Sequence, residues 1–222
     1  MNNRWGFLTE TMLNKNLKSN QNDKVFFDKL GNLKNIKFET GHIKSRLECK
    51  EESELNTKNC YILNPTSIED GLINHNDLSL VKVQIDKLNN LRFATANSII
   101  LRISSPYNAA ISTTLDEDLI VSSFCIRITI DENDIIDTYY LLAFLNSKLF
   151  HDQMVKLSQG SIAFNVSIEK LMEVRVPLPS LDKQQLIGKA YKALIEQTRS
   201  MKKIIEYEKE FNDSYFLGLE EI

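Results

Sequence analysis

The chain has 222 residues and a net charge of −3, and its 42% hydrophobic and 26% charged residues are ordinary for a soluble globular protein. This length supports one sizeable core, or one domain with an extension. The three cysteines contain no Cys-x-x-Cys pair and the three histidines are scattered, which argues against a disulfide framework and a zinc site. No apolar run approaches the roughly 18–20 residues of a membrane span, and the N-terminus lacks a secretory pattern. We therefore expect a cytoplasmic protein with no membrane part, no metal and no cofactor.

Charge is unevenly distributed along the chain. Residues 24–50 hold seven Lys/Arg against three Asp/Glu, and residues 183–203 hold six against one. Between these two zones, residues 51–118 hold five basic and ten acidic residues. Basic zones of this kind suit a nucleic-acid partner, although ordinary solvated faces account for each of them equally well.

The first 23 residues are polar and rich in Asn and Lys, which predicts a flexible lead-in before a folded domain over residues 24–179. Runs rich in β-branched and aromatic residues predict strands at residues 25–27, 60–63, 98–103 and 121–130. The residues of the last strand alternate between two faces. The face predicted to lie against the core carries Phe124, Ile126, Ile128 and Ile130. The face predicted to be less buried carries Cys125, Arg127 and Thr129.

A helix is predicted to begin at Asp137, which is a favourable N-cap residue, and to fade near Ser158. Its apolar face is formed by residues at helical spacing, which are Leu141, Phe144, Leu145 and Leu149.

The segment before the C-terminal part of the chain alternates between short elements. Ser167 predicts the cap of a short helix through residue 172. A strand is predicted at residues 173–176, where Pro177 and Pro179 are expected to end it.

A single long helix is predicted over residues 180–217, with a short tail at 218–222. Ser180 is a favourable N-cap, and Asp182 in the first turn suits the helix dipole. A helix of about 35 residues measures about 50 Å, so we expect it to protrude from the domain. Apolar residues repeat at heptad spacing and predict a seam for another helix, formed by Ile187, Ala190, Leu194, Met201 and Ile204. The alternative is a helix that folds back along its own domain.

The fold class that follows is mixed α/β (α+β). We expect one globular domain with a mostly antiparallel or mixed sheet, followed by the long protruding C-terminal helix.

No catalytic motif is present in the sequence. It contains no nucleotide-binding glycine loop, no Gly-x-Ser-x-Gly elbow and no Asn/Asp-Pro-Pro-aromatic motif of an adenine methyltransferase. The acidic residues cluster in predicted turns rather than on the strands where a metal-dependent nuclease would carry them. The sequence therefore predicts a binding protein with no catalytic residues.

Three polar loops are candidates for DNA binding, because Lys and Arg can hold phosphates while Asn, Gln and Arg can read base edges. The candidate residues are Lys44 and Arg46 in the first loop, Arg102, Ser105, Tyr107 and Asn108 in the second, and Lys156, Gln159, Ser161 and Asn165 in the third.

The stretch SQGSIAFNVSIEKLMEVRVPLPSLDKQQLI at residues 158–187 resembles the end of a target recognition domain in type I restriction-modification specificity subunits. It has the Gly-Ser loop, the Ser-led helix, the strand, Pro-Leu-Pro and the Gln that opens a long helix. The resemblance to this family covers roughly residues 24–199. The further segments that resemble it are KLGNLKNIKFETGHIKSR, SIILRISSPYNAAI, LIVSSFCIRI and IDTYYLLAFLNSKLF.

The chain departs from that family in three respects. Ala96-Asn97 stands where Gly-Asp is common before the central strand, and Lys183-Gln184-Gln185 stands where Glu-Gln is common. A full specificity subunit carries two recognition domains and two conserved helices, whereas this chain resembles one of each.

The resemblance implies a non-catalytic protein that selects double-stranded DNA for a methyltransferase (modification) subunit and, through it, for a restriction and translocation subunit. A half-length chain could rebuild the two-helix spacer as a homodimer, and twofold symmetry would then give a bipartite palindromic target. Two alternatives remain, namely an orphan recognition module that pairs with another half-subunit, and a cytosolic interaction protein without a DNA role that uses a helical docking arm.

Overall fold

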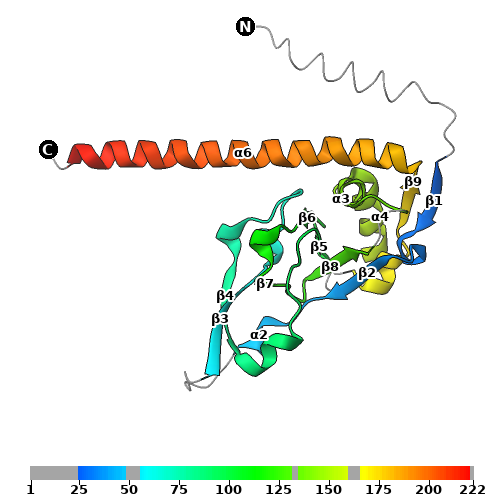
Figure 1. The fold of residues 1–222 in the computed structure, drawn as a ribbon, viewed down its shortest axis with the longest axis horizontal. Coiled ribbons are helices and arrows are strands. Elements are labelled where there is room, and N and C mark those ends of the chain that lie inside the picture. Colours follow the sequence, from blue (N-terminus) through cyan, green and yellow to red (C-terminus); the bar gives the residue numbers. More distant parts are fainter. Residues whose placement is uncertain (1–24, 49–55, 132–134, 160–165, 221–222) are drawn as a thin grey trace, which may run out of the picture.

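The computed structural model describes residues 25–48, 56–131, 135–159 and 166–220. The strands are β1 (Phe26–Lys29), β2 (Ile36–Thr40), β3 (Thr57–Ile62), β4 (Ser79–Gln84), β5 (Ile99–Arg102), β6 (Ala109–Ile111), β7 (Leu119–Ile120), β8 (Cys125–Ile130) and β9 (Arg175–Leu178). The α-helices are α2 (Lys44–Leu47), α3 (Thr138–Leu145), α4 (Lys148–Ser158), α5 (Ile168–Met172) and α6 (Leu181–Glu220). The mixed α/β class and the long C-terminal helix are therefore confirmed (Figure 1).

The described strands form three sheets. The largest has the order β2-β8-β5-β6, with every neighbouring pair antiparallel. The second has the order β4-β3-β7 and is mixed, because β3 pairs antiparallel with β4 and parallel with β7. The third is the antiparallel ribbon β1-β9.

Apolar clusters cover both faces of the four-stranded sheet along β5, β6 and the start of β8. On one face, side chains such as Ile99 and Ile126 pack in a core with residues of α3 and α4, among them Leu141 and Phe150. On the other face, a second cluster joins Ile100 and Cys125 to several other apolar side chains, which are Leu63, Ile68, Ala94, Ala110, Leu119 and Val121. The burial of this second face raises the pKa of the Cys125 thiol to about 11.

The expectations for residues 121–130 are partly wrong. The strand begins only at Cys125, because the preceding residues turn and the Ser123 N–H donates to the His42 carbonyl oxygen at 2.8 Å. Phe124 lies in that turn and is 49% exposed instead of facing the core. Cys125 is fully buried although it belongs to the set predicted as less buried, because the second apolar cluster covers its face of the sheet at the start of β8.

The single helix predicted from residue 137 to 158 is two helices. The predicted cap is confirmed, since the Tyr140 N–H donates to Asp137 Oδ1 at 2.9 Å. The break falls at Asn146, whose side chain accepts from the Ala109 N–H at 2.8 Å and donates to the Ala109 carbonyl at 2.9 Å. Ser147 then caps α4, and Leu149 points to solvent rather than to the core.

The strand before α6 does not end at Pro177. This proline lies inside β9, opposite Phe27 of β1. A proline is tolerated there because β9 has one neighbour in its sheet, so one side of the strand needs no backbone donor. The cap predicted at Ser167 is confirmed by a hydrogen bond of 3.4 Å from the Lys170 N–H.

Helix α6 begins where Ser180 predicts it, since the Ser180 carbonyl accepts from the N–H groups of Lys183 and Gln184 at 3.0 Å. The buried Gln184 side chain donates to the carbonyl oxygens of Pro179 at 3.0 Å and Ile135 at 3.2 Å, and it accepts from the Asp137 N–H at 3.1 Å. One glutamine thus joins the end of β9, the start of α3 and the start of α6.

Two glycines let α6 lie close to the domain. A Cβ on Gly188 would sit 2.2 Å from Asp137 Oδ1, so the helix can cross the N-terminus of α3 only at a residue without a side chain. Further along, a Cβ on Gly71 would lie 2.6 Å from the Ile195 side chain. Gly71 also has a φ of +81°, which favours glycine.

The 40 residues of α6 span about 60 Å at about 1.5 Å per residue, and the helix passes over the domain and beyond it (Figure 1). Its first half packs against the domain, as the alternative interpretation held, with an ion pair between Lys202 and Glu69 at the far end. Residues 201–217 are all exposed. Ile187 is partly buried and packs against the core, so this residue of the expected seam is not free to bind a second helix.

Candidate DNA interface

Two of the three predicted loops lie at one edge of the four-stranded sheet. Antiparallel pairing places the ends of β2 and β5 beside the starts of β8 and β6. Thr40 is opposite Ile126, and Arg102 is opposite Cys125. The first loop leaves β2 and the second joins β5 to β6, so the topology alone brings these two loops to the same edge.

Backbone hydrogen bonds hold the loops together. The turn at residues 121–124 bonds to the first loop, where the His42 N–H donates to the Val121 carbonyl at 2.8 Å. The same turn bonds to the second loop, where the Ile103 N–H donates to the Phe124 carbonyl at 3.1 Å. The residue that follows the third loop, Val166, donates its N–H to the Ile103 carbonyl at 3.0 Å. We call residues 40–46, 103–108 and 121–124 the loop edge.

The first loop presents both of its predicted basic residues on the short helix α2. Arg46 is exposed, and Lys44 is partly exposed with its Nζ 3.7 Å from Glu48 Oε1. An exposed pair at this distance contributes little and gives way easily to a stronger anion such as phosphate. Both residues therefore present positive charge at the surface of the first loop.

The second loop differs from the prediction. Tyr107 is only 2% exposed and belongs to the main core, so it cannot contact DNA from this position. Arg102 is partly buried and donates from Nε to Ser104 Oγ at 3.1 Å, and Asn108 accepts from the Arg102 N–H at 2.9 Å. Ser105 is the predicted residue of this loop that stands exposed.

The third loop is described only in part. Lys156 and Gln159 are exposed at the end of α4. Ser161 and Asn165 lie outside the described residues. Lys156 and Gln159 thus remain as the described candidates of this loop.

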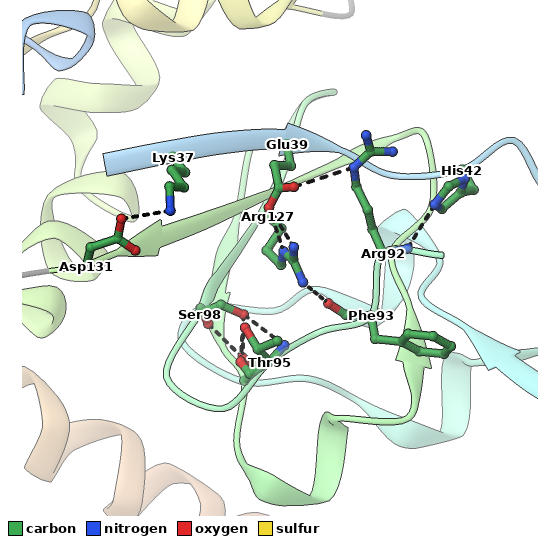
Figure 2. Close-up of polar contacts among 10 residues, drawn as sticks. Lys37, Glu39, His42, Arg92, Phe93, Thr95, Ser98, Arg127 and Asp131 are labelled. Carbon is green, nitrogen blue, oxygen red and sulfur yellow. Dashed lines mark hydrogen bonds and ion pairs between the residues drawn. The ribbon is translucent and has the colours of Figure 1, made fainter. Parts of the chain in front are cut away.

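One basic residue beside the first loop is not predicted from the sequence. Arg92 belongs to the acidic middle of the chain, yet its N–H donates to Nε2 of His42, 50 residues away, at 2.9 Å (Figure 2). Burial and the neighbouring Arg92 lower the pKa of His42, so the imidazole is neutral at neutral pH and keeps Nε2 as an acceptor. Nothing in a single sequence pairs two residues so far apart.

A network of charged residues covers the outer side of β2 and β8 beside the first loop (Figure 2). Glu39 Oε2 accepts from Arg127 Nη2 at 2.6 Å and from Arg127 Nε at 3.1 Å. Glu39 Oε1 lies 3.7 Å from Arg92 Nε. At the other end of β2, Lys37 pairs with Asp131 at 2.9 Å.

Within the described ranges, no group of three or more His, Cys, Asp or Glu side chains is arranged to hold a metal ion. Nor does any helix in that part of the chain combine the length and apolar character needed to cross a membrane.

Comparison with protein families gives a match over most of the chain. A family model described as the type I restriction modification DNA specificity domain matches residues 9–207. No curated protein matches the chain.

Two solved structures share the fold. The S subunit of a type I restriction-modification system from M. genitalium has 16% identity and a TM-score of 0.60, with 89% of this chain and 46% of that chain covered. The HsdS subunit from Thermoanaerobacter tengcongensis has 16% identity and a TM-score of 0.53, with 81% and 44% covered. The chain therefore spans slightly less than half the length of the proteins that it matches.

Proposed function

The chain belongs to the family of type I restriction-modification DNA specificity domains, and we propose that it selects the DNA target of such a system without performing catalysis itself. The observation that carries this proposal is the meeting of the first two polar loops at one sheet edge, to which the backbone after the third loop is hydrogen-bonded. Exposed side chains of the three loops offer two kinds of contact, since Lys44, Arg46 and Lys156 suit phosphates while Gln159 and Ser105 suit base edges.

The proposed partners are double-stranded DNA, a modification subunit and, through it, a restriction subunit. With a net charge of −3, the chain should bind DNA weakly when alone, because phosphate contacts dominate affinity. The modification subunit would then supply much of the binding.

We further propose that two copies pair through α6. An exposed row of residues runs along this helix with alternating spacings of four and three, which we call the outer seam: Ala190, Leu194, Gln197, Met201, Ile204, Glu208, Phe211 and Tyr215. At about 100° per residue, the outer seam lies roughly opposite to Gln184, Gly188 and Ile195, which face the domain. A second helix could therefore cover it without disturbing the domain.

The outer seam is complementary to itself in an antiparallel arrangement. If Met201 of one copy faces Ile204 of the other, then Leu194 faces Phe211 and the polar Gln197 faces the polar Glu208. The same register sets the smallest side chain, Ala190, against the large Tyr215. Apolar or aromatic residues then face each other at every level except that of Gln197 and Glu208, which can hydrogen-bond to each other.

The charge of α6 favours the same direction. Residues 183–203 hold six Lys/Arg and one acid, whereas residues 204–222 hold one Lys and six acids. Acids near a helix C-terminus oppose the helix dipole, and an antiparallel partner would bring basic residues alongside them. A dimer of this kind has twofold symmetry, which predicts a bipartite palindromic target with a fixed spacer.

The test is selection from a random duplex library, using the purified chain together with a type I modification subunit. The proposal expects enrichment of two inverted half-sites at one spacing. Enrichment of no sequence would contradict DNA recognition, and enrichment of a single half-site would contradict the dimer.

A second candidate function rests on the exposed outer seam and the negative net charge. In that case the chain is an interaction protein whose α6 docks another protein, with no DNA role. It predicts that DNA binding in the presence of the modification subunit is unchanged when Lys44 and Arg46 are both replaced by alanine. An orphan module that pairs with a different half-subunit would instead enrich a target whose two halves differ.

A further inference from the structure

Two arginines share one carboxylate beside the first loop, and they are held very differently (Figure 2). The side chain of Arg127 is 16% exposed and bonds twice to Glu39 and once, at 2.5 Å, to the Phe93 carbonyl. The side chain of Arg92 is 42% exposed, and its Nε lies 3.7 Å from Glu39 Oε1. Arg127 is therefore part of the internal structure, whereas Arg92 lies at its surface.

The terminal nitrogens of Arg92 point away from Glu39 and from Arg127 in Figure 2. The contact through Nε leaves both terminal nitrogens directed outward as a planar pair of donors. Such a pair matches two acceptor atoms on one ligand, as in a phosphate group or along the edge of a guanine.

The backbone of Arg92 is fixed to the loop edge on both sides. Its N–H donates to His42 of the first loop at 2.9 Å, and its carbonyl accepts from the Val121 N–H at 2.9 Å. The side chain is thus presented from a fixed point beside His42, which precedes Lys44 by two residues in the chain.

The local charge balance supports an anionic ligand at this point. Glu39 carries one negative charge between two arginines, so the group of three keeps one positive charge. The adjacent pair of Lys37 and Asp131 is neutral. Because Arg127 makes the shorter bonds to Glu39, the uncompensated charge belongs mainly to Arg92.

We propose that Arg92 is a DNA-contacting residue whose terminal nitrogens bind a pair of acceptors on the duplex, either two phosphate oxygens or O6 and N7 of a guanine. Glu39 orients the guanidinium through Nε, and His42 fixes the backbone that carries it. The assignment rests on the proposed function and adds a contact residue to the three loops.

The test compares the DNA affinity of three full-length proteins, which are Arg92→Ala, Arg92→Lys and wild type. Each is mixed with the modification subunit. Two DNAs are used, namely the duplex that the wild-type protein enriches and a random duplex. Arg175→Ala is the matched control, because this exposed arginine lies on β9, away from the first loop (Figure 1). Affinity is measured over a range of salt concentrations, and thermal unfolding checks that each variant is folded.

Arg92→Ala is expected to weaken binding by about tenfold, while Arg175→Ala leaves it unchanged. If the ligand is phosphate, the plot of log affinity against log salt becomes shallower by about 0.9 for each Arg92 side chain that is removed. In that case Arg92→Lys keeps most of the affinity. If the ligand is guanine, both variants lose the preference for one base pair of the half-site and the salt slope changes less.

The two possible failures are distinct. A wild-type complex that enriches no sequence contradicts the proposed function, and the salt slope on random duplex still tests the contact. Wild-type affinity, slope and sequence preference in Arg92→Ala would overturn the assignment of Arg92 while leaving the proposed function in place.

Discussion

Helix α6 has two faces that lie on one backbone and are stabilised in different ways. The face toward the domain carries the buried Gln184, Gly188 and Ile195, whose contacts are all made within the chain. The outer seam carries apolar side chains such as Leu194, Met201 and Phe211, which are exposed over their greater part. The domain face should therefore determine folding, and the outer seam should determine association.

The largest expected effect is on association. Replacing Leu194 and Met201 together by Glu places two charges in each copy of the seam, and the dimer dissociation constant should rise at least about 100-fold, because buried unpaired charge is costly. Sedimentation would then show monomers at micromolar protein, with thermal stability of the domain unchanged.

The matched control makes the same change elsewhere. Leu80→Glu with Leu115→Glu alters two leucines that are exposed on other elements. It adds the same charge and should leave the dimer intact. Dimers that persist in the seam variant would show that the outer seam is not the interface.

The next largest effect concerns the anchor of the domain face. Gln184→Ala removes three hydrogen bonds at the junction of β9, α3 and α6, and the free energy of unfolding should fall by about 2 kcal/mol because buried partners are left unsatisfied. Its exposed neighbour is the control, since Gln185→Ala should change stability by less than about 0.5 kcal/mol. Urea denaturation measures both, and equal effects would contradict the anchoring role.

Replacing Gly188 by alanine should lower the stability of the protein, which is the opposite of the usual effect of this change in a helix. A Gly→Ala change in a helix usually stabilises the folded state by about 0.5–1 kcal/mol. Here the added Cβ would meet Asp137 Oδ1 and disturb the cap of α3, so the variant should lose about 1–2 kcal/mol. Ser200→Ala on the exposed part of the same helix serves as control, and a stabilising Gly188→Ala would refute the close crossing.

The smallest expected effect on stability is at Lys202, where the face of α6 that contacts the domain ends. Lys202 pairs with Glu69, but both side chains are partly exposed, so Lys202→Ala should cost no more than about 0.5 kcal/mol. The adjacent Lys203→Ala should cost less still. A larger loss from Lys202 in thermal unfolding would extend the domain face beyond this point.

Local signals in the sequence predict much of the fold. The caps at Asp137 and Ser167, the start of α6 at Ser180 and the strand near residues 98–103 depend on neighbouring residues, and the structure confirms them. The three polar loops are likewise recognisable by composition, and the meeting of the first two at one edge follows from antiparallel pairing.

The remaining features depend on contacts between distant segments. Asn146 breaks a helix because it bonds to the backbone of Ala109, and Tyr107 turns inward from a loop that looks exposed by composition. Alternation failed at Cys125 because a second apolar cluster covers that face of the sheet at the start of β8. Arg92 joins the first loop through a hydrogen bond across 50 residues, which no local pattern indicates.

The central claim is that the outer seam binds a second copy in an antiparallel register, and disulfide cross-linking of two single variants tests it most directly. Leu194→Cys and Phe211→Cys proteins are oxidised separately and as a mixture. The antiparallel register brings residue 194 of one copy next to residue 211 of the other and keeps the two copies of residue 194 about 25 Å apart along the helix. Cross-linked dimers should therefore form mainly in the mixture. Equal cross-linking within each variant alone would indicate a parallel pair and contradict the account.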